Sequence, residues 1–289
     1  MHDFLELAKI RITFFVGMSA AFGYVLAANS VSIAMIPPVL GIFLLSCSSA
    51  AMNHFQEISS DANMHRTSRR PLPSGAISEP AAVAFIVTLG IAGSALTFLG
   101  GGATAFALAL AAFASYNLVY TPLKKVSPFA VVPGSLVGSF PVMAGWAAAG
   151  GSPVDPRLLS VAAFFFIWQI PHFWLLMDMY SQDYERAKFP TLRKFFDDRT
   201  FAVLTYLLII ALFVSSWLFL TTGVVDNLMT RLAVIGVGVW LVVATYPIIS
   251  NRREKKFNKV AFMEINLYVL AVTLVVMLDK VLSLPWKGF

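Results

Sequence analysis

Long runs of apolar residues alternate with short polar segments along the whole chain. A helix needs about 20 apolar residues to cross the hydrocarbon core of a bilayer, and the runs have that length. Because the runs are continuously apolar, they favour helices over the alternating strands of a membrane barrel. The pattern predicts an all-α polytopic membrane protein with one domain over residues 1–289. Nine transmembrane helices are expected, at residues 10–28, 33–52, 80–99, 102–120, 130–150, 158–178, 201–222, 230–250 and 260–284.

Composition agrees with a membrane protein and excludes a soluble globule. Hydrophobic residues make up 58% of the 289 residues and charged residues 12%, whereas soluble domains carry roughly 45–50% and about 25%. The first apolar run is not expected to be a cleaved signal peptide, because it is long and follows the acidic Asp3 and Glu6. The single cysteine, Cys47, excludes a disulfide framework and a cysteine metal cluster.

The basic residues predict the orientation in the membrane. Seventeen of the 21 Lys and Arg residues precede the first expected span or lie in the loops after spans two, four, six and eight. The positive-inside rule therefore places the N-terminus in the cytoplasm and the C-terminus outside, across a prokaryotic inner membrane. The net charge of +6 is explained by orientation, and no nucleic-acid partner is expected.

The loop after the second expected span carries the strongest chemical signal. Asn53, Glu57 and Asp61 follow one another at intervals of four residues, so on a helix they form one oxygen-bearing stripe that drifts by only about 80°. Mg²⁺ prefers such oxygen ligands and often bridges them to a phosphate. Arg66, Arg69 and Arg70 follow, and guanidinium groups match phosphate oxygens. The alternative is a solvated helix end in which the arginines serve only orientation.

A second polar segment begins inside the sixth expected span, at Pro171, which we expect to interrupt the helix beside a cavity. The adjacent His172 would be a general base, a haem ligand or an ordinary interhelical hydrogen-bonding partner. Asp178 and Asp183 follow, but five residues turn a helix by about 140°, so they are not expected to share a face.

A third element lies where the fourth expected span leaves the membrane. Tyr120 and Lys124 are four residues apart and would lie on one helix face. Lys124 would pair with a phosphate as a point charge, or would serve only as an orientation charge.

These motifs resemble those of the UbiA superfamily of intramembrane prenyltransferases. The pattern Asn53-x3-Glu57-x3-Asp61 is similar to the first acidic motif of the superfamily. The surrounding segments resemble the haem O synthase (protoheme IX farnesyltransferase) branch over nearly the whole chain. These segments are Leu7-x-Lys9-x-Arg11, Met64-x-Arg66-Thr67-x2-Arg70-Pro71-Leu72-Pro73-x-Gly75, Tyr120-Thr-Pro-Leu-Lys124, Phe140-Pro141 to Gly145-Trp146-Ala147, Trp168-Gln169-x-Pro171-His172-Phe173-Trp174 and Asp183-Tyr184.

The resemblance implies a UbiA-like bundle around a central cavity and a Mg²⁺-dependent transfer of farnesyl from farnesyl diphosphate to a vinyl group of haem b, giving haem o. Membrane lipid is an expected surrounding, and a haem A synthase or a terminal oxidase assembly route is the implied recipient. The expected roles follow from the matched positions. They are Asn53, Glu57, Asp61 and His172 for catalysis, Arg66, Arg70, Lys124 and Tyr120 for the diphosphate, and Asn53, Glu57, Asp61 and Asp183 for the metal.

Three positions depart from the haem O synthase pattern. Ser59 replaces a further acid, Lys188 replaces a glycine, and Ala130 replaces an asparagine. Three other functions stay open at this point. They are a prenyltransferase for a quinone precursor or another aromatic acceptor, a transporter with ion-relaying Asp and His groups, and a non-catalytic haem-binding assembly protein.

Overall fold

The structure is a computed structural model that describes residues 2–250 and 255–282. Within these ranges the regular elements are all helices, which confirms the predicted all-α membrane architecture. Eight stretches are long and apolar enough to cross a membrane. They are Ile10–Ala28, Ile33–Gln56, Glu79–Leu123, Pro128–Ala148, Pro156–Met179, Asp198–Thr221, Leu228–Ser250 and Lys256–Leu282. The orientation residues Arg252, Arg253 and Lys287 lie outside the described residues.

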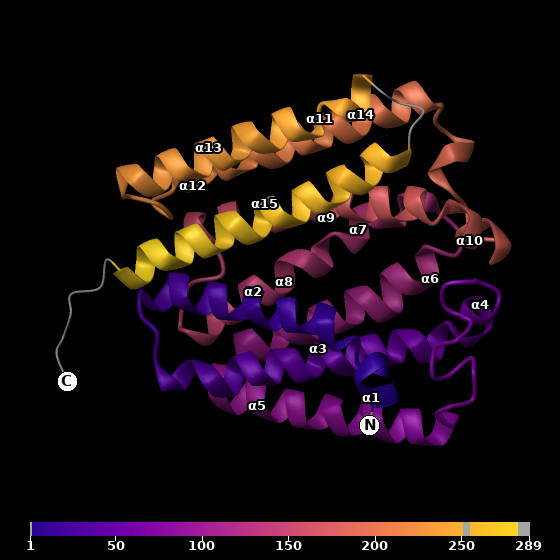
Figure 1. Cartoon of the computed structure of the whole chain (residues 1–289). Coiled ribbons are helices and arrows are strands. Elements are labelled where there is room, and N and C mark those ends of the chain that lie inside the picture. Colours follow the sequence, from indigo (N-terminus) through magenta and orange to yellow (C-terminus); the bar gives the residue numbers. More distant parts are fainter. Residues whose placement is uncertain (1, 251–254, 283–289) are drawn as a thin grey trace.

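The main helices run roughly side by side, as Figure 1 shows. In chain order they are α1 (His2–Leu7), α2 (Ile10–Ala28), α3 (Ile36–Gln56), α4 (Ile58–Ala62), α5 (Glu79–Ala114), α6 (Thr121–Leu123), α7 (Val131–Gly134), α8 (Leu136–Ala148), α9 (Pro156–Met179), α10 (Ser181–Arg186), α11 (Asp198–Ser216), α12 (Leu218–Thr221), α13 (Leu228–Thr245), α14 (Pro247–Ser250) and α15 (Lys255–Leu282). Four short 3₁₀ or π turns join them: η1 (Ile33–Met35), η2 (Ser115–Tyr120), η3 (Pro128–Ala130) and η4 (Leu192–Lys194).

The predicted spans 80–99 and 102–120 lie in one stretch of 45 residues, Glu79–Leu123, so the count of nine separate spans is not confirmed. This stretch does not run straight. Gly102 has φ 79° and ψ 179°, and the ring centroids of Phe98 and Phe106 are 5.7 Å apart. Eight residues of a straight helix would separate them by about 12 Å. The chain therefore reverses at Gly102, where glycine permits the positive φ.

Two local predictions need correction. The helix of Asn53 ends at Gln56, because Glu57 has φ −114° and ψ 12°, and α4 begins only at Ile58. The acidic stripe is therefore bent at its middle residue. In contrast, α9 continues through Pro171 to Met179, so the predicted interruption at Pro171 is wrong. A proline inside a membrane helix is tolerated when neighbouring groups satisfy the freed backbone.

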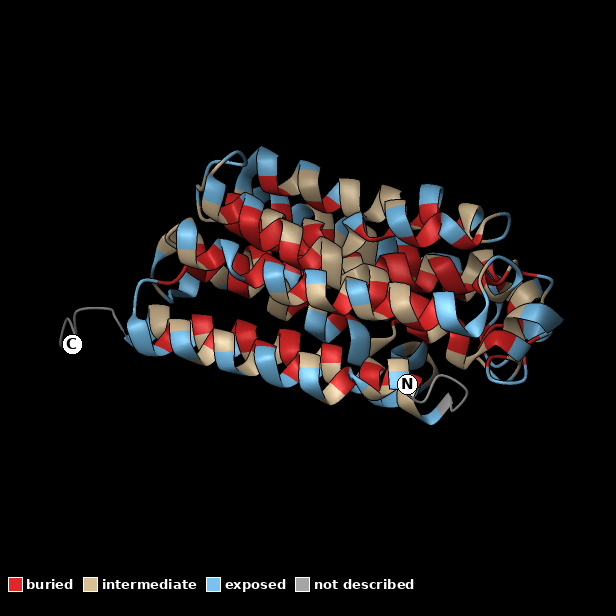
Figure 2. Cartoon of the chain, turned by 90° about the horizontal axis from the view of Figure 1, so that it is seen from above, coloured by how far each residue is buried: buried red, intermediate tan, exposed pale blue. Residues whose placement is uncertain are grey.

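Small residues bring the helices into close contact. A Cβ atom on Gly145 of α8 would lie 1.8 Å from the carbonyl oxygen of Ala20 in α2, and one on Gly23 of α2 would lie 2.0 Å from that of Val142 in α8. Such backbone approach is typical of membrane helix pairs. Buried residues line the inward faces of the bundle, and the outer faces are exposed (Figure 2). Large apolar side chains such as Ile91 of α5 and Val243 of α13 are exposed there, which suits contact with lipid.

Candidate active site

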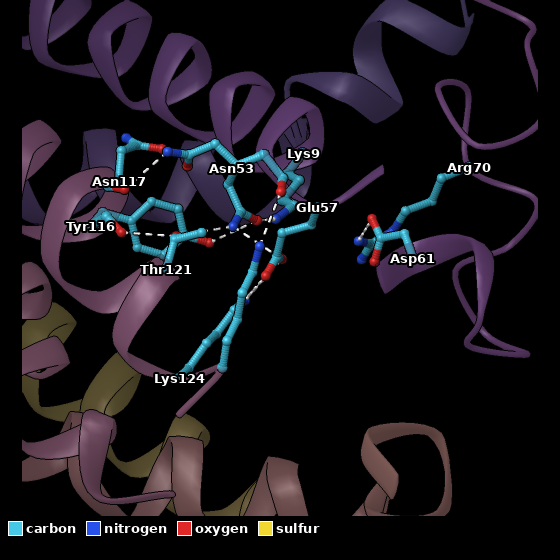
Figure 3. A network of polar contacts seen from close by, with 11 residues as sticks. Lys9, Asn53, Glu57, Asp61, Arg70, Tyr116, Asn117, Thr121 and Lys124 are labelled. Atoms are coloured by element: carbon cyan, nitrogen blue, oxygen red, sulfur yellow. Dashed lines mark hydrogen bonds and ion pairs between the residues drawn. The ribbon is translucent and has the colours of Figure 1, made fainter. Parts of the chain in front are cut away.

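Polar side chains from separate helices converge on Asn53, near the end of α3. Its Oδ1 accepts hydrogen bonds from Lys9 Nζ at 2.8 Å and Tyr116 OH at 3.3 Å. Its Nδ2 donates to Glu57 Oε2 and Thr121 Oγ1, both at 3.1 Å. Asn53 is only 1% exposed. Its amide is therefore held rigidly between Lys9, which precedes α2, Glu57, which follows α3, and the segment formed by η2 and α6 (Figure 3).

Both carboxylates of the first motif are buried, and each has a basic partner. Lys124 Nζ lies 2.8 Å from the carboxylate oxygens of Glu57. Arg70 Nη1 lies 2.7 Å from Asp61 Oδ2. Figure 3 shows the Asp61–Arg70 pair to one side of the Glu57–Lys124 pair. Arg70 reaches Asp61 because the loop after α4 turns back on itself. The structure thus pairs each of the two predicted acids with one of the predicted cations.

Asp183 reaches the same loop from α10. Its carboxylate accepts hydrogen bonds from the backbone N–H groups of His65 and Arg66, at 3.1 and 3.4 Å. The Arg66 guanidinium lies 4.6 Å from the ring centroid of Tyr180, and its side chain is exposed. Asp183 therefore positions the loop that carries the arginines.

Charge and burial shift the pKa values of Lys9 and Tyr184 at this end of the bundle. Desolvation, followed by the positive charges of Arg70 and Lys124, lowers the pKa of Lys9 to about 7, against the opposing effect of Glu57 and Asp61. Burial raises the pKa of Tyr184 to about 12. The Tyr184 hydroxyl therefore keeps its proton at neutral pH and can donate a hydrogen bond.

A widened π-helical turn, Ser115–Tyr120, shapes the neighbouring wall. Such turns occur often at functional sites. Here the turn directs Tyr116 toward Asn53 and Asn117 toward Ser49, where Asn117 Nδ2 donates to Ser49 Oγ at 2.6 Å. The rings of Tyr116 and Tyr120 stack with centroids 5.7 Å apart.

An aromatic wall leads from the charged groups into the membrane. Lys124 Nζ lies 5.3 Å from the ring centroid of Tyr120, as their spacing predicts. Tyr120 stacks on Phe173 at 5.0 Å, and Phe173 contacts His172 at 5.6 Å. His172 is seven residues before the end of α9 at Met179, so it lies about 10 Å deeper along the helix.

His172 and Asp178 lie apart from the acidic pairs. His172 Nδ1 is 2.9 Å from Asn266 Oδ1 on α15. Asp178 is buried in its own ion pair with Arg193 at 2.5 Å, and Asn258 donates to its second oxygen at 2.6 Å. Asp178 and Asp183 accordingly face different partners, as their spacing predicts. Asp178 ties the ends of α9 and α15 together.

The side-chain oxygen atoms at the site suit a hard cation, although Glu57 and Asp61 are ion-paired with basic side chains in this structure. Asn53, Glu57, Asp61 and Asp183 offer only oxygen atoms, which Mg²⁺ prefers. Among the described residues, no group of three or more His, Cys, Asp or Glu side chains is arranged closely enough to hold a metal ion. Lys124 and Arg70 instead neutralise Glu57 and Asp61. The predicted ligands fit Mg²⁺ by their chemistry, and their role stays a prediction.

Sequence reasoning missed several residues at the site. Lys9 was considered only as a charge that sets orientation and as part of a family motif. No role was predicted for Tyr116, Asn117, Thr121 or Asn266. An asparagine inside an apolar span is itself a signal, because polar groups in membrane helices are costly and usually functional. At Lys188, where the family pattern has glycine, the structure has φ 59°, a conformation that glycine adopts most easily.

Known proteins resemble this chain in sequence. Residues 12–268 match the UbiA prenyltransferase family. The chain is 36% identical over 185 residues to the protoheme IX farnesyltransferase of Oleidesulfovibrio alaskensis, covering 64% of this chain and 66% of that protein. It is 35% identical over 235 residues to that of Alkalilimnicola ehrlichii, covering 77% and 78%. The chain thus spans slightly less than two thirds of the length of the first of these relatives.

Solved structures share the fold at low sequence identity. A structure of digeranylgeranylglyceryl phosphate synthase superposes with a TM-score of 0.77 at 15% identity, covering 97% of this chain and 98% of that one. A UbiA homologue from Archaeoglobus fulgidus bound to GPP and Mg²⁺ has a TM-score of 0.68 at 15% identity, covering 93% and 99%. The family match and the shared fold agree over nearly the whole chain, and this integral membrane protein belongs to the UbiA prenyltransferase family.

Proposed function

We propose that the protein transfers the farnesyl group of farnesyl diphosphate to a vinyl group of haem b, giving haem o and diphosphate. Relatives that are about 35% identical carry the name protoheme IX farnesyltransferase. The observation that carries the proposal is the aromatic wall from Tyr120 through Phe173 to His172, which begins at a charged end and continues into the membrane. Such a path suits a substrate with a charged head, a fifteen-carbon tail and a flat apolar acceptor.

The charged end suits the diphosphate. We assign Arg66, Arg70 and Lys124 to the diphosphate oxygens, with Tyr120 beside them. Lys9, whose pKa is about 7, would gain its full positive charge beside a diphosphate. Guanidinium and ammonium groups bind phosphate oxygens well. Lys124 and Arg70 are ion-paired with Glu57 and Asp61, so their two positive charges are already present at the site.

We assign the Mg²⁺ ligands to Asn53, Glu57, Asp61 and Asp183. A divalent ion bound there would supply Lewis-acid stabilisation of the charge that develops on the departing diphosphate. The chain contributes a fixed amide, because Asn53 makes four hydrogen bonds. Two of them are accepted by Oδ1, so an ion bound to that oxygen would replace Lys9 or Tyr116 there.

The carbon chemistry would take place along the aromatic wall. The allylic C–O bond of farnesyl diphosphate breaks, and its electron pair leaves with the diphosphate. The vinyl carbon of haem b then forms a C–C bond to the farnesyl cation, and water adds to the resulting cation with loss of one proton. The ring faces of Tyr120 and Phe173 stabilise positive charge through their quadrupoles. His172 lies at the deeper end, where we place the porphyrin.

We also propose that the charged end faces the cytoplasm, in a prokaryotic inner membrane with the N-terminus inside. Figure 1 places α4, α6 and α10 at one end of the bundle. Most basic residues among the described ranges belong to this end, whereas Arg157, Arg231 and Lys280 belong to the other. Basic residues collect on the cytoplasmic side of membrane proteins.

The test is reconstitution of the full chain in lipid vesicles with haem b, farnesyl diphosphate and Mg²⁺, followed by mass spectrometry of the extracted haems. We expect the mass of haem b to increase by one farnesyl group and one water, and chelation to abolish the product. Glu57→Gln should reduce the rate by at least tenfold, on the order of the effect of losing one charge-stabilising group. Glu79→Gln, at an exposed position, is the matched control. Prenylation of a quinone precursor but not of haem would overturn the proposal.

A further inference from the structure

His172 has a defined hydrogen-bonding partner that no role described above requires. Its Nδ1 lies 2.9 Å from Asn266 Oδ1. The other end of the Asn266 amide is also committed, because Nδ2 donates to the carbonyl oxygen of Phe262 one helical turn earlier. A nitrogen that donates to a carbonyl leaves the amide oxygen facing the histidine. That oxygen only accepts, so Nδ1 of His172 carries the proton.

This assignment decides the chemistry of the opposite ring nitrogen. In a neutral imidazole with its proton on Nδ1, Nε2 presents a lone pair. No residue in the described part of the chain bonds to Nε2. The ring is held in place by Trp168, Phe262 and Phe173, with centroids 5.0, 4.8 and 5.6 Å away. His172 is half-buried, so the lone pair belongs to a fixed ring that a ligand can approach.

A second observation also indicates a ligand here. The indole N–H of Trp168 is buried and has no acceptor within the residues that the structure describes. A buried donor without a partner is rare and calls for an explanation. Trp168 lies one turn from His172 on α9, and its ring packs against the imidazole. A planar ligand with a metal ion at its centre and acceptor atoms at its edge would satisfy both groups, and haem b combines an iron ion with carboxylates at the edge of an apolar ring.

We propose that Asn266 is a positioning residue that fixes the Nδ1–H tautomer of His172, so that Nε2 coordinates the iron of bound haem b. The inference deepens the proposed function and rests on it for the identity of the ligand. The bond from Nδ1 to a fixed acceptor is the usual way in which a metal-ligating histidine is oriented. Asn266 belongs to α15 and His172 to α9, so the pair joins two helices beside the position proposed for the porphyrin.

The experiment is haem binding to the purified full chain in nanodiscs, followed by absorption and electron paramagnetic resonance spectra without farnesyl diphosphate. We expect His172→Ala to lose the histidine-ligated spectrum. Asn266→Leu should raise the Kd for haem b by about 10–100-fold, the usual effect of removing such an outer partner. Asn266→Asp keeps the acceptor oxygen and should restore binding to within a few-fold of wild type.

Asn258→Leu is the matched control. Asn258 lies two turns earlier on α15 and bonds to Asp178 rather than to His172, so its loss should affect stability but not the haem spectrum. Wild-type spectra and affinity in Asn266→Leu would overturn the positioning role, and an unchanged spectrum in His172→Ala would overturn iron ligation. If haem binds as expected but is never farnesylated, the proposed function fails while this inference stands.

Discussion

Replacing Lys124 with methionine tests whether the buried ion pair between Lys124 and Glu57 stabilises the folded protein. The Lys124 side chain is 12% exposed and that of Glu57 6%, with 2.8 Å between nitrogen and oxygen. At an effective dielectric constant of about 20, the Coulomb attraction at this distance is about 6 kcal/mol, before the cost of desolvation. Removing one partner of a buried pair costs about 3–5 kcal/mol.

We expect the lower end of this range, about 3 kcal/mol, because Asn53 still donates to Glu57. For a chain of this size, that loss lowers the unfolding midpoint by on the order of 10 °C. The measurement is thermal unfolding in detergent at pH 7, without substrate or metal. Stability in this state is independent of any catalytic role of Lys124.

Lys125→Met is the control for the Lys124 substitution, because Lys125 is exposed and, within residues 2–250 and 255–282, bonds only to the backbone carbonyl of Gln56, at 3.2 Å. It should change stability by less than about 0.5 kcal/mol. The double variant Glu57→Gln/Lys124→Met removes both charges and should recover part of the loss. Equal midpoints for the Lys124 and Lys125 variants would refute the reasoning.

Three further substitutions, two of them with a control variant, test the loop, the packing and the backbone. Arg70→Met should lower the unfolding midpoint and Arg69→Met should not, because Arg70 is ion-paired and Arg69 is exposed; equal effects would contradict the ion pair. Gly145→Ala should cost about 1–3 kcal/mol or more by overpacking, since its Cβ would lie 1.8 Å from a backbone oxygen of α2. Gly236→Ala, with open space around it, should instead stabilise α13 by about 0.5–1 kcal/mol in a denaturation series. Lys188→Gly should raise the unfolding midpoint slightly, because a left-handed conformation costs a non-glycine residue about 1–2 kcal/mol and φ is 59° here; an unchanged or lower midpoint would show that no strain is relieved.

The sequence alone determined the class of protein and much of the chemistry. Lipid offers no hydrogen-bonding partners, so backbone groups inside a membrane must bond to one another. Uninterrupted apolar runs therefore form helices, independently of the segments that pack beside them. The same local reasoning applied to the spacing of Tyr120 and Lys124, because four residues along a helix bring two side chains onto one face. Their contact in the structure follows from that spacing.

Tertiary structure decided how the polar residues pair. The four-residue spacing of Asn53, Glu57 and Asp61 assumed a continuous helix, but α3 ends at Gln56. Glu57 and Asp61 consequently turn to different cations, Lys124 and Arg70. These partners lie on other segments, so spacing within one segment could not predict them.

The reversal at Gly102 and the pairing of His172 with Asn266 show the same limit. Glycine permits a reversal, but helix packing decides whether the chain makes one. His172 and Asn266 are 94 residues apart in the chain and 2.9 Å apart in space. The sequence determines which groups must avoid lipid, because that cost is local, whereas the identity of each partner depends on which helices pack together.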